Sequence, residues 1–135
     1  AKMLYAYSEA TVPKFTVILR KAYGGGYIAM NSRHLGADFV FFFFFAEIAV
    51  MGSVGAANII FKKDIAEAEN QDEMRKVKVQ EYIDKFANPY VAAGKGFIDA
   101  VIEPSETRKA LIHALSLSKG KDEFRPVKKH GVPPF

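Results

Sequence analysis

The fold of this chain is decided by the stretch Phe15-Thr-Val-Ile-Leu-Arg-Lys-Ala-Tyr-Gly-Gly-Gly-Tyr27. Its first five residues form an apolar run without alternation, which is typical of a strand buried on both faces. The three glycines allow a tight turn, and we expect a short helix over residues 27–34. A strand, a glycine turn and a helix in this order predict an α/β fold with mostly parallel strands.

The same alternation continues on both sides of this stretch. Hydrophobic periodicity predicts a helix over residues 1–10, a buried strand from residue 39, and either the continuation of that strand or a third strand over 47–51. A helix over 52–65, a loop over 66–71 and an amphipathic helix over 72–86 are expected next. A short helix over 90–93 and a strand over 97–102 follow them. Pro104 opens a last helix, where proline is tolerated. We expect Leu111, Ile112 and Leu115 on its buried face.

Composition narrows the possible functions. The 135 residues suffice for one domain, and with 50% hydrophobic residues they can bury a core. The absence of cysteine excludes a disulfide scaffold, a thiolate nucleophile and a cysteine-ligated metal. Of the net charge of +4, five basic and two acidic residues between Lys119 and His130 supply +3. A positively charged nucleic-acid-binding surface on the rest of the domain is therefore not expected.

No targeting or membrane-spanning segment is expected. The opening residues lack the charged, apolar and cleavage regions of a signal peptide. The longest apolar stretch, Phe39 to Met51, contains Glu47 and is shorter than the roughly 18 to 20 residues that a bilayer span needs. We expect a cytoplasmic location, or the mitochondrial matrix in a eukaryote.

The glycine turn has three interpretations. Gly24-x-Gly26-x-x-Ala29 fits a loose dinucleotide-binding pattern, but residues 20–23 separate the apolar strand from the glycines. Backbone amides at a helix N-terminus could instead form an oxyanion hole. A plain tight turn is the third interpretation.

Eight blocks in order carry a family resemblance. They are Ala1-Lys-Met-Leu-Tyr-Ala-Tyr-Ser-Glu-Ala-Thr-Val-Pro13, Arg20-Lys-Ala-Tyr-Gly-Gly-Gly-Tyr27, Leu35-Gly-Ala-Asp38, Ala46-Glu-Ile-Ala-Val-Met-Gly52, Gly55-Ala-Ala, Phe86-Ala-Asn-Pro-Tyr90, Glu103-Pro-Ser-Glu-Thr-Arg108 and Lys128-Lys-His-Gly131. Over essentially its whole length the chain resembles the carboxyltransferase subunits of biotin-dependent enzymes. These include the propionyl-CoA carboxylase β subunit, the transcarboxylase large subunit and the methylmalonyl-CoA decarboxylase α subunit.

The resemblance implies an incomplete crotonase-like (ClpP/crotonase) spiral of strand–strand–helix units. Residues 1–118 would be the C-terminal, biotin-side part of the carboxyltransferase domain, and residues 119–135 a basic tail. The implied activity transfers a carboxyl group between carboxybiotin and a short-chain acyl-CoA of the propionyl-CoA or methylmalonyl-CoA type. The acyl-CoA-binding half would be missing, so we expect the chain alone to be inactive.

Site residues follow by position from the resemblance. The backbone amides of Gly25 and Gly26 would form the biotin-side oxyanion hole, and Tyr23, Gly24 and Tyr27 would belong to the biotin pocket. Ile28 occupies the position at which the family selects the acyl chain.

Cofactors and partners are also implied by the resemblance. Biotin would arrive on a carrier domain and a CoA thioester would be the substrate. Expected partners are a biotin carboxyl carrier protein, a biotin carboxylase, the acyl-CoA-binding half and further copies of the subunit. A sodium-pumping methylmalonyl-CoA decarboxylase is the alternative within this chemistry; a dinucleotide-binding domain and a non-catalytic assembly fragment are alternatives of other classes.

Other candidates are weaker. None of the three histidines (His34, His113 and His130) has a partner three or four residues away that makes a metal site, so no metal site is expected. Glu47 is expected to pair with a nearby cation. Phe41 to Phe45 depart from the family's aromatic–Ala-Trp-Pro stretch, and we expect alternate rings of this run to face different surfaces.

Overall fold

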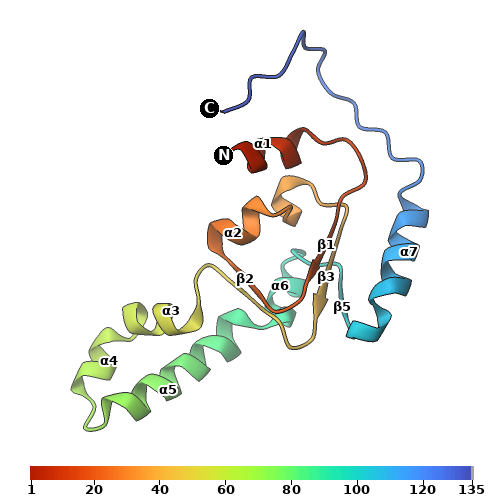
Figure 1. Ribbon diagram of the computed structural model, residues 1–135. Helices are drawn as coiled ribbons and strands as arrows, with labels where there is room; N and C mark the ends of the chain where they lie inside the picture. Colours follow the sequence, from red (N-terminus) through yellow and green to blue (C-terminus); the bar gives the residue numbers. More distant parts are fainter. Residues whose placement is uncertain (135) are drawn as a thin grey trace.

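The computed structural model describes residues 1–134, and Figure 1 shows a small sheet flanked by helices. In chain order its elements are α1 (Lys2–Glu9), β1 (Phe15–Ile18), β2 (Lys21–Tyr23), α2 (Gly24–Ala29), η1 (Arg33–Leu35), β3 (Phe39–Phe43), β4 (Glu47–Ala49), α3 (Ser53–Ile60), α4 (Lys62–Glu67), α5 (Gln71–Tyr82), η2 (Ile83–Ala87), α6 (Pro89–Gly94), β5 (Ala100–Ile102), η3 (Pro104–Glu106) and α7 (Thr107–Leu117).

The strands form two parallel sheets. One has three strands in the order β1-β3-β5, and the other pairs β2 with β4. The prediction of parallel pairing is therefore confirmed. Residues 47–49 form a separate strand rather than a continuation of β3.

The core surrounds β3, the central strand of the larger sheet. Val40 and Phe42 are fully buried, and residues from α2, α6 and α7 pack around them. Figure 1 shows α2 and α7 on opposite sides of this sheet. Because both faces of β3 are covered, three consecutive rings, Phe41 to Phe43, are all buried.

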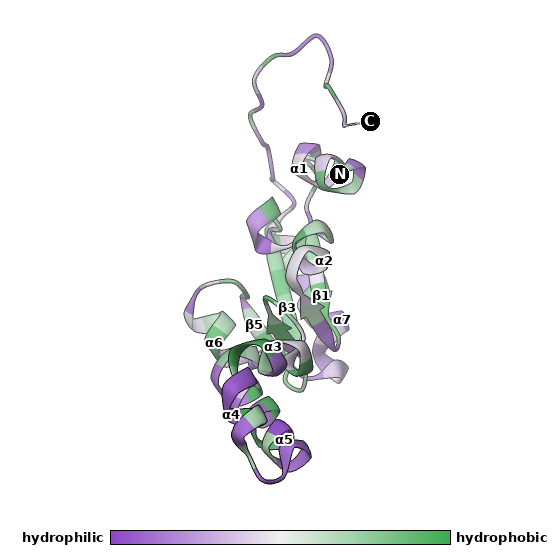
Figure 2. Ribbon diagram, turned by 90° about the vertical axis from the view of Figure 1, so that its left-hand side faces the viewer, coloured by the Kyte–Doolittle hydropathy of each residue, from purple (hydrophilic) through white to green (hydrophobic). Residues whose placement is uncertain are grey.

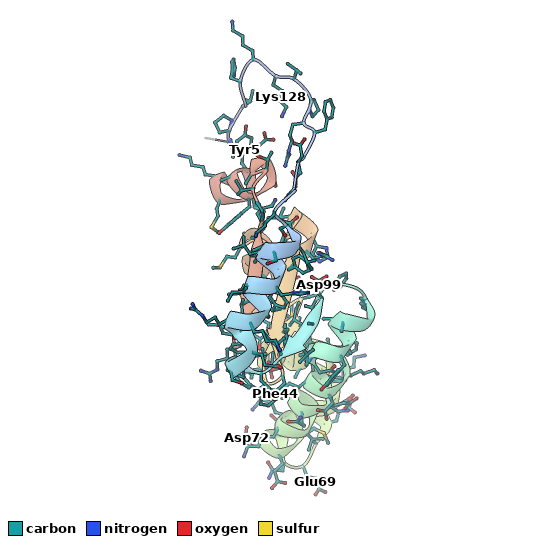
Figure 3. The ribbon with its side chains drawn as sticks, turned by 90° about the vertical axis from the view of Figure 1, so that its right-hand side faces the viewer. Tyr5, Phe44, Glu69, Asp72, Asp99 and Lys128 are labelled. Carbon is teal, nitrogen blue, oxygen red and sulfur yellow. The ribbon has the colours of Figure 1, made fainter. Side chains whose placement is uncertain are left out.

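The phenylalanine run ends in solvent. Phe44 and Phe45 lie in the turn after β3 and are 49% and 53% exposed. Burial therefore does not alternate from ring to ring, and the change from buried to exposed comes at the end of the strand. Figure 3 shows Phe44 at the end of the sheet that is nearer to α5.

Three helix predictions were wrong in detail. The helix expected over residues 52–65 is divided at Phe61 into α3 and α4, and α4 continues to Glu67 inside the expected loop. Leu111 of α7 packs against the core as expected, whereas Ile112 and Leu115 are 55% and 54% exposed, and the buried residue of this helix is Ala114. The small side chain of Ala114 lets the helix lie close to the sheet.

Helices α3, α4 and α5 project away from the sheet (Figure 1), and α4 and α5 are largely hydrophilic (Figure 2). Ala56 of α3, Tyr82 of α5 and Ala87 of η2 form a second, smaller core that joins these three elements. None of the helices within residues 1–134 combines the length and hydrophobicity needed to span a bilayer.

The segment after α7 returns to the start of the chain. Lys121 Nζ lies 2.9 Å from Asp38 Oδ2, Arg125 donates to the Ser8 carbonyl, and Lys128 lies near Glu9. Figure 3 shows Lys128 and Tyr5 at the same end of the molecule. Burial favours a higher pKa for Asp38, but hydrogen bonds from Lys121 and from the Lys14 amide outweigh it, so the pKa is lowered.

Candidate functional site

Strand β2 leads directly into the three glycines. Residues 21–23, part of the segment 20–23 that separates the apolar run from the glycines, form this strand, and α2 begins at Gly24 itself. The helix predicted for residues 27–34 thus starts three residues earlier, and a 3-10 turn over Arg33–Leu35 follows it. The glycines therefore form the first turn of a helix, where amide N–H groups lack intrahelical acceptors.

Gly24 is required by the backbone. Its φ is +52°, a left-handed conformation that side chains disfavour. A Cβ atom at this position would also lie 2.7 Å from the Val50 carbonyl oxygen. Gly24 thus sets the direction in which the next two residues face.

Gly25 and Gly26 face open space. A Cβ atom added to either residue would have no heavy atom within 4 Å, and both residues are exposed. Within residues 1–134, no oxygen accepts a hydrogen bond from the N–H of Gly25 or Gly26. Two adjacent free amides at the start of a helix can stabilise a negatively charged oxygen.

A large apolar cavity of about 760 Å³ borders this turn. It is lined by Gly24, Gly25, Tyr27, Ile28, His34, Ile48, Ala49, Val50, Met51, Ile59, Ile60, Tyr82, Phe86, Val91, Ala92, Lys95 and Phe97. Ile28 is 40% exposed there. The walls from α3 and η2 were not predicted, because nothing in the local sequence brings residues 59–60 and 86 to the glycines.

A second cavity, of about 740 Å³, lies on the other side of the turn. Tyr23, Gly26 and Tyr27 line it together with strand β1. The structure therefore brings Gly24, Tyr27 and Ile28 together in one cavity and places Tyr23 in the other, with Tyr27 between them. The three residues expected to share one pocket do not all do so.

Tyr23 instead bonds to a carboxylate. Its hydroxyl donates a hydrogen bond to Glu47 Oε2, and burial, followed by the bond to Glu47, raises the pKa of Tyr23 to about 12. The expectation that Glu47 pairs with a cation is wrong, since the partner in the described residues is a phenol. This bond could not be predicted from the sequence, because residues 24 apart meet only once β2 and β4 are paired.

The histidines occupy separate places. His34 stacks edge-on against Phe97 and Tyr27 at the first cavity, whereas His113 lies on α7 and His130 in the C-terminal segment. Among residues 1–134 there is no group of three His, Asp or Glu side chains that could hold a metal ion.

Comparison with known proteins gives consistent results. The family model described as carboxyl transferase domain matches residues 1–133. The methylmalonyl-CoA carboxyltransferase 12S subunit of Propionibacterium freudenreichii subsp. shermanii is 58% identical over 97% of this chain and 25% of its own length. The methylmalonyl-CoA decarboxylase subunit alpha of Veillonella parvula is also 58% identical, over 100% of this chain and 25% of its own.

Solved structures resemble the chain over the same extent. A crystal structure of transcarboxylase 12S, with methylmalonyl-coenzyme A and methylmalonic acid bound, matches with a TM-score of 0.92 and 56% identity over 98% of this chain and 26% of that one. The geranyl-CoA carboxylase β subunit of P. aeruginosa matches with a TM-score of 0.72 and 25% identity, again over 98% and 26%. The chain thus spans about a quarter of the length of its relatives.

Proposed function

The chain belongs to the carboxyl transferase domain family, and on that premise we propose that it forms the biotin side of a carboxyltransferase site. The reaction would move a carboxyl group between carboxybiotin and a short-chain acyl-CoA of the propionyl-CoA or methylmalonyl-CoA type. Membership also confirms the family resemblance and the crotonase-like α/β fold predicted from the sequence.

The free amides of Gly25 and Gly26 are the observation that carries the proposal. Gly25 lines the apolar first cavity and Gly26 lines the second cavity, and both N–H groups are unused within residues 1–134. A biotin ring system is mostly apolar and has one polar ureido group, so this combination of wall and donors suits it. When bound, carboxybiotin supplies the carboxyl group and, after its release, a basic ureido oxygen.

Each part of the site then has a defined task. The Gly25 and Gly26 amides hold the negative ureido oxygen, and the apolar walls exclude water that would weaken these hydrogen bonds. Gly24 aims the amides through its left-handed backbone. Ile28, in the same cavity, is proposed to limit the size of the acyl group.

The same residues would serve transfer and decarboxylation. The transcarboxylase and decarboxylase relatives are equally similar to this chain, at 58% identity each. We therefore assign the chain to the step that both reactions share, handling of the biotin carboxyl group. The proposed partners are a biotin carboxyl carrier protein, a biotin carboxylase, the acyl-CoA-binding half and further copies of the subunit.

A proline pair tests the proposal in a full-length subunit that carries this sequence. Gly25→Pro removes one amide donor, and Gly55→Pro makes the same change in the first turn of α3, where proline is tolerated. Loss of one oxyanion-hole donor costs about 2.7–4 kcal/mol, or roughly 10²–10³-fold in kcat. The measurement is carboxyl transfer between carboxybiotin and propionyl-CoA.

We expect a loss of that size for Gly25→Pro and near-normal kcat for Gly55→Pro, with both variants folded by circular dichroism. Equal activity of the two variants would show that the Gly25 amide takes no part in the reaction. An inactive wild-type subunit would overturn the assigned reaction.

A further inference from the structure

The glycine turn directly follows a strand of a very small sheet. Strand β2 has three residues, pairs only with β4 among the described residues, and ends at Tyr23, immediately before Gly24. A two-stranded sheet of this length is marginal on its own. The position of the Gly25 and Gly26 amides therefore depends on whatever fixes β2 against β4.

Side chains cross-brace the two strands. In the parallel register Lys21 lies opposite Glu47 and Tyr23 opposite Ala49, so the bond from Tyr23 to Glu47 runs diagonally across the pair. Diagonal neighbours are within reach of aromatic and long side chains. The bond joins the last residue of β2 to the first residue of β4 and opposes sliding of one strand along the other.

Backbone contacts complete the brace at both ends. The Glu47 amide donates to the Arg20 carbonyl at 2.7 Å, before β2 begins. Beyond β4, the Val50 carbonyl lies so close to Gly24 that a Cβ there would approach to 2.7 Å, and a Cβ at Gly52 would lie 3.4 Å from the Tyr23 ring. The segment 47–52 thus contacts β2 and the glycine turn on one side and restricts their movement.

We propose that Glu47, acting through the Tyr23 hydroxyl, is a positioning residue that holds the Gly25 and Gly26 amides in their working geometry. This inference rests on the proposed function. Neither side chain needs to touch the reacting atoms, because the effect passes along β2 into the first turn of α2. A shift of about 1 Å in a positioned group can cost roughly a hundredfold in rate.

The chemistry of the pair suits a fixed brace. A hydrogen bond to a carboxylate is stronger than one between neutral groups. With a pKa raised to about 12, Tyr23 keeps its proton and remains a donor throughout the neutral range. In residues 1–134 no cation forms an ion pair with Glu47, so nothing there competes with the phenol.

Four substitutions in the full-length subunit test the proposal. Tyr23→Phe removes only the hydroxyl, Glu47→Leu removes the acceptor at similar size, and Glu47→Gln keeps an acceptor oxygen. Tyr90→Phe, on the exposed side of α6, is the matched control for loss of a phenol hydroxyl. The measurements are kcat and KM for the acyl-CoA in carboxyl transfer, and amide hydrogen exchange of the peptide that contains residues 24–29.

We expect kcat to fall roughly tenfold to a hundredfold in Tyr23→Phe and Glu47→Leu, with KM changed by less than about twofold. Glu47→Gln should recover most of the rate, and Tyr90→Phe should match the wild type. Exchange at residues 24–29 should be faster in the two impaired variants. A purely structural role would instead lower the amount of folded, active enzyme and leave kcat per active site unchanged.

Wild-type kcat and unchanged exchange in both Tyr23→Phe and Glu47→Leu would overturn the inference while leaving the proposed function intact. An inactive wild type would instead overturn the proposed function. Hydrogen exchange would still decide, in that case, whether Glu47 orders the turn. If Tyr23→Phe does not fold, the comparison of Glu47→Leu with Glu47→Gln carries the test.

Discussion

Gly24 and Gly25 are neighbours, but each lacks a side chain for a different structural reason. Gly24 has a φ of +52° and lies against the Val50 carbonyl, so its lack of a side chain is a backbone requirement. Gly25 has open space where a Cβ would be, so its lack of a side chain leaves its amide accessible. The identical letters in the sequence conceal this difference.

The difference predicts opposite effects of alanine. Gly24→Ala should lower the free energy of unfolding by about 1–2 kcal/mol or more, because alanine is strained at positive φ and would meet a backbone oxygen. Gly25→Ala, in helical backbone with free space, should leave stability unchanged or raise it by about 0.5–1 kcal/mol. Denaturant unfolding of both variants measures this, and similar stability of the two would contradict the assigned conformations.

Residue-level chemistry was only partly predictable from the sequence. The glycine motif marked the turn, since glycines after a strand restrict the local backbone to few conformations. The bond from Tyr23 to Glu47 was not predictable, because it depends on the register of two strands that lie 24 residues apart.

Strand β3 shows how an element distributes identical side chains. Phe41 to Phe43 are buried because β3 is central and helices cover both faces, whereas Phe44 and Phe45 enter a turn. These two adjacent exposed rings form an apolar surface patch that favours association with other molecules.

This distribution gives a prediction within one run of residues. Phe42→Ala should cost about 3–5 kcal/mol of stability, because a fully buried ring is lost. Phe44→Ala should leave stability within about 1 kcal/mol of the original and raise solubility. Thermal unfolding and light scattering measure the two effects, and an equal loss of stability in both variants would refute the placement of the strand end.

At the element scale, long periodic segments were predictable and short ones were not. The amphipathic spacing over 72–86 correctly predicted a helix there, but not that its last part, η2, is π-helical. Strand β2 was missed because Arg20 and Lys21 make its three residues look like a polar spacer. Its pairing with β4 overrides that local composition.

At the scale of the whole molecule, the chain brings distant segments to one turn. Strands β2 and β4, α3 and η2 meet around the glycines, and two cavities of similar size flank them. The chain covers about a quarter of the length of its relatives, so the proposed reaction belongs to the full-length subunit. We propose that biotin binds in the first of these cavities, which Tyr27, Ile28 and Met51 line.

A crystal structure of the full-length subunit with biotin tests this claim most directly. We expect the biotin ring in the cavity lined by Tyr27, Ile28 and Met51, with its ureido oxygen about 2.7–3.1 Å from the Gly25 and Gly26 nitrogens. A ring bound along strand β1 in the other cavity, or an oxygen that accepts from neither amide, would show that the first cavity and its amides are not the biotin site.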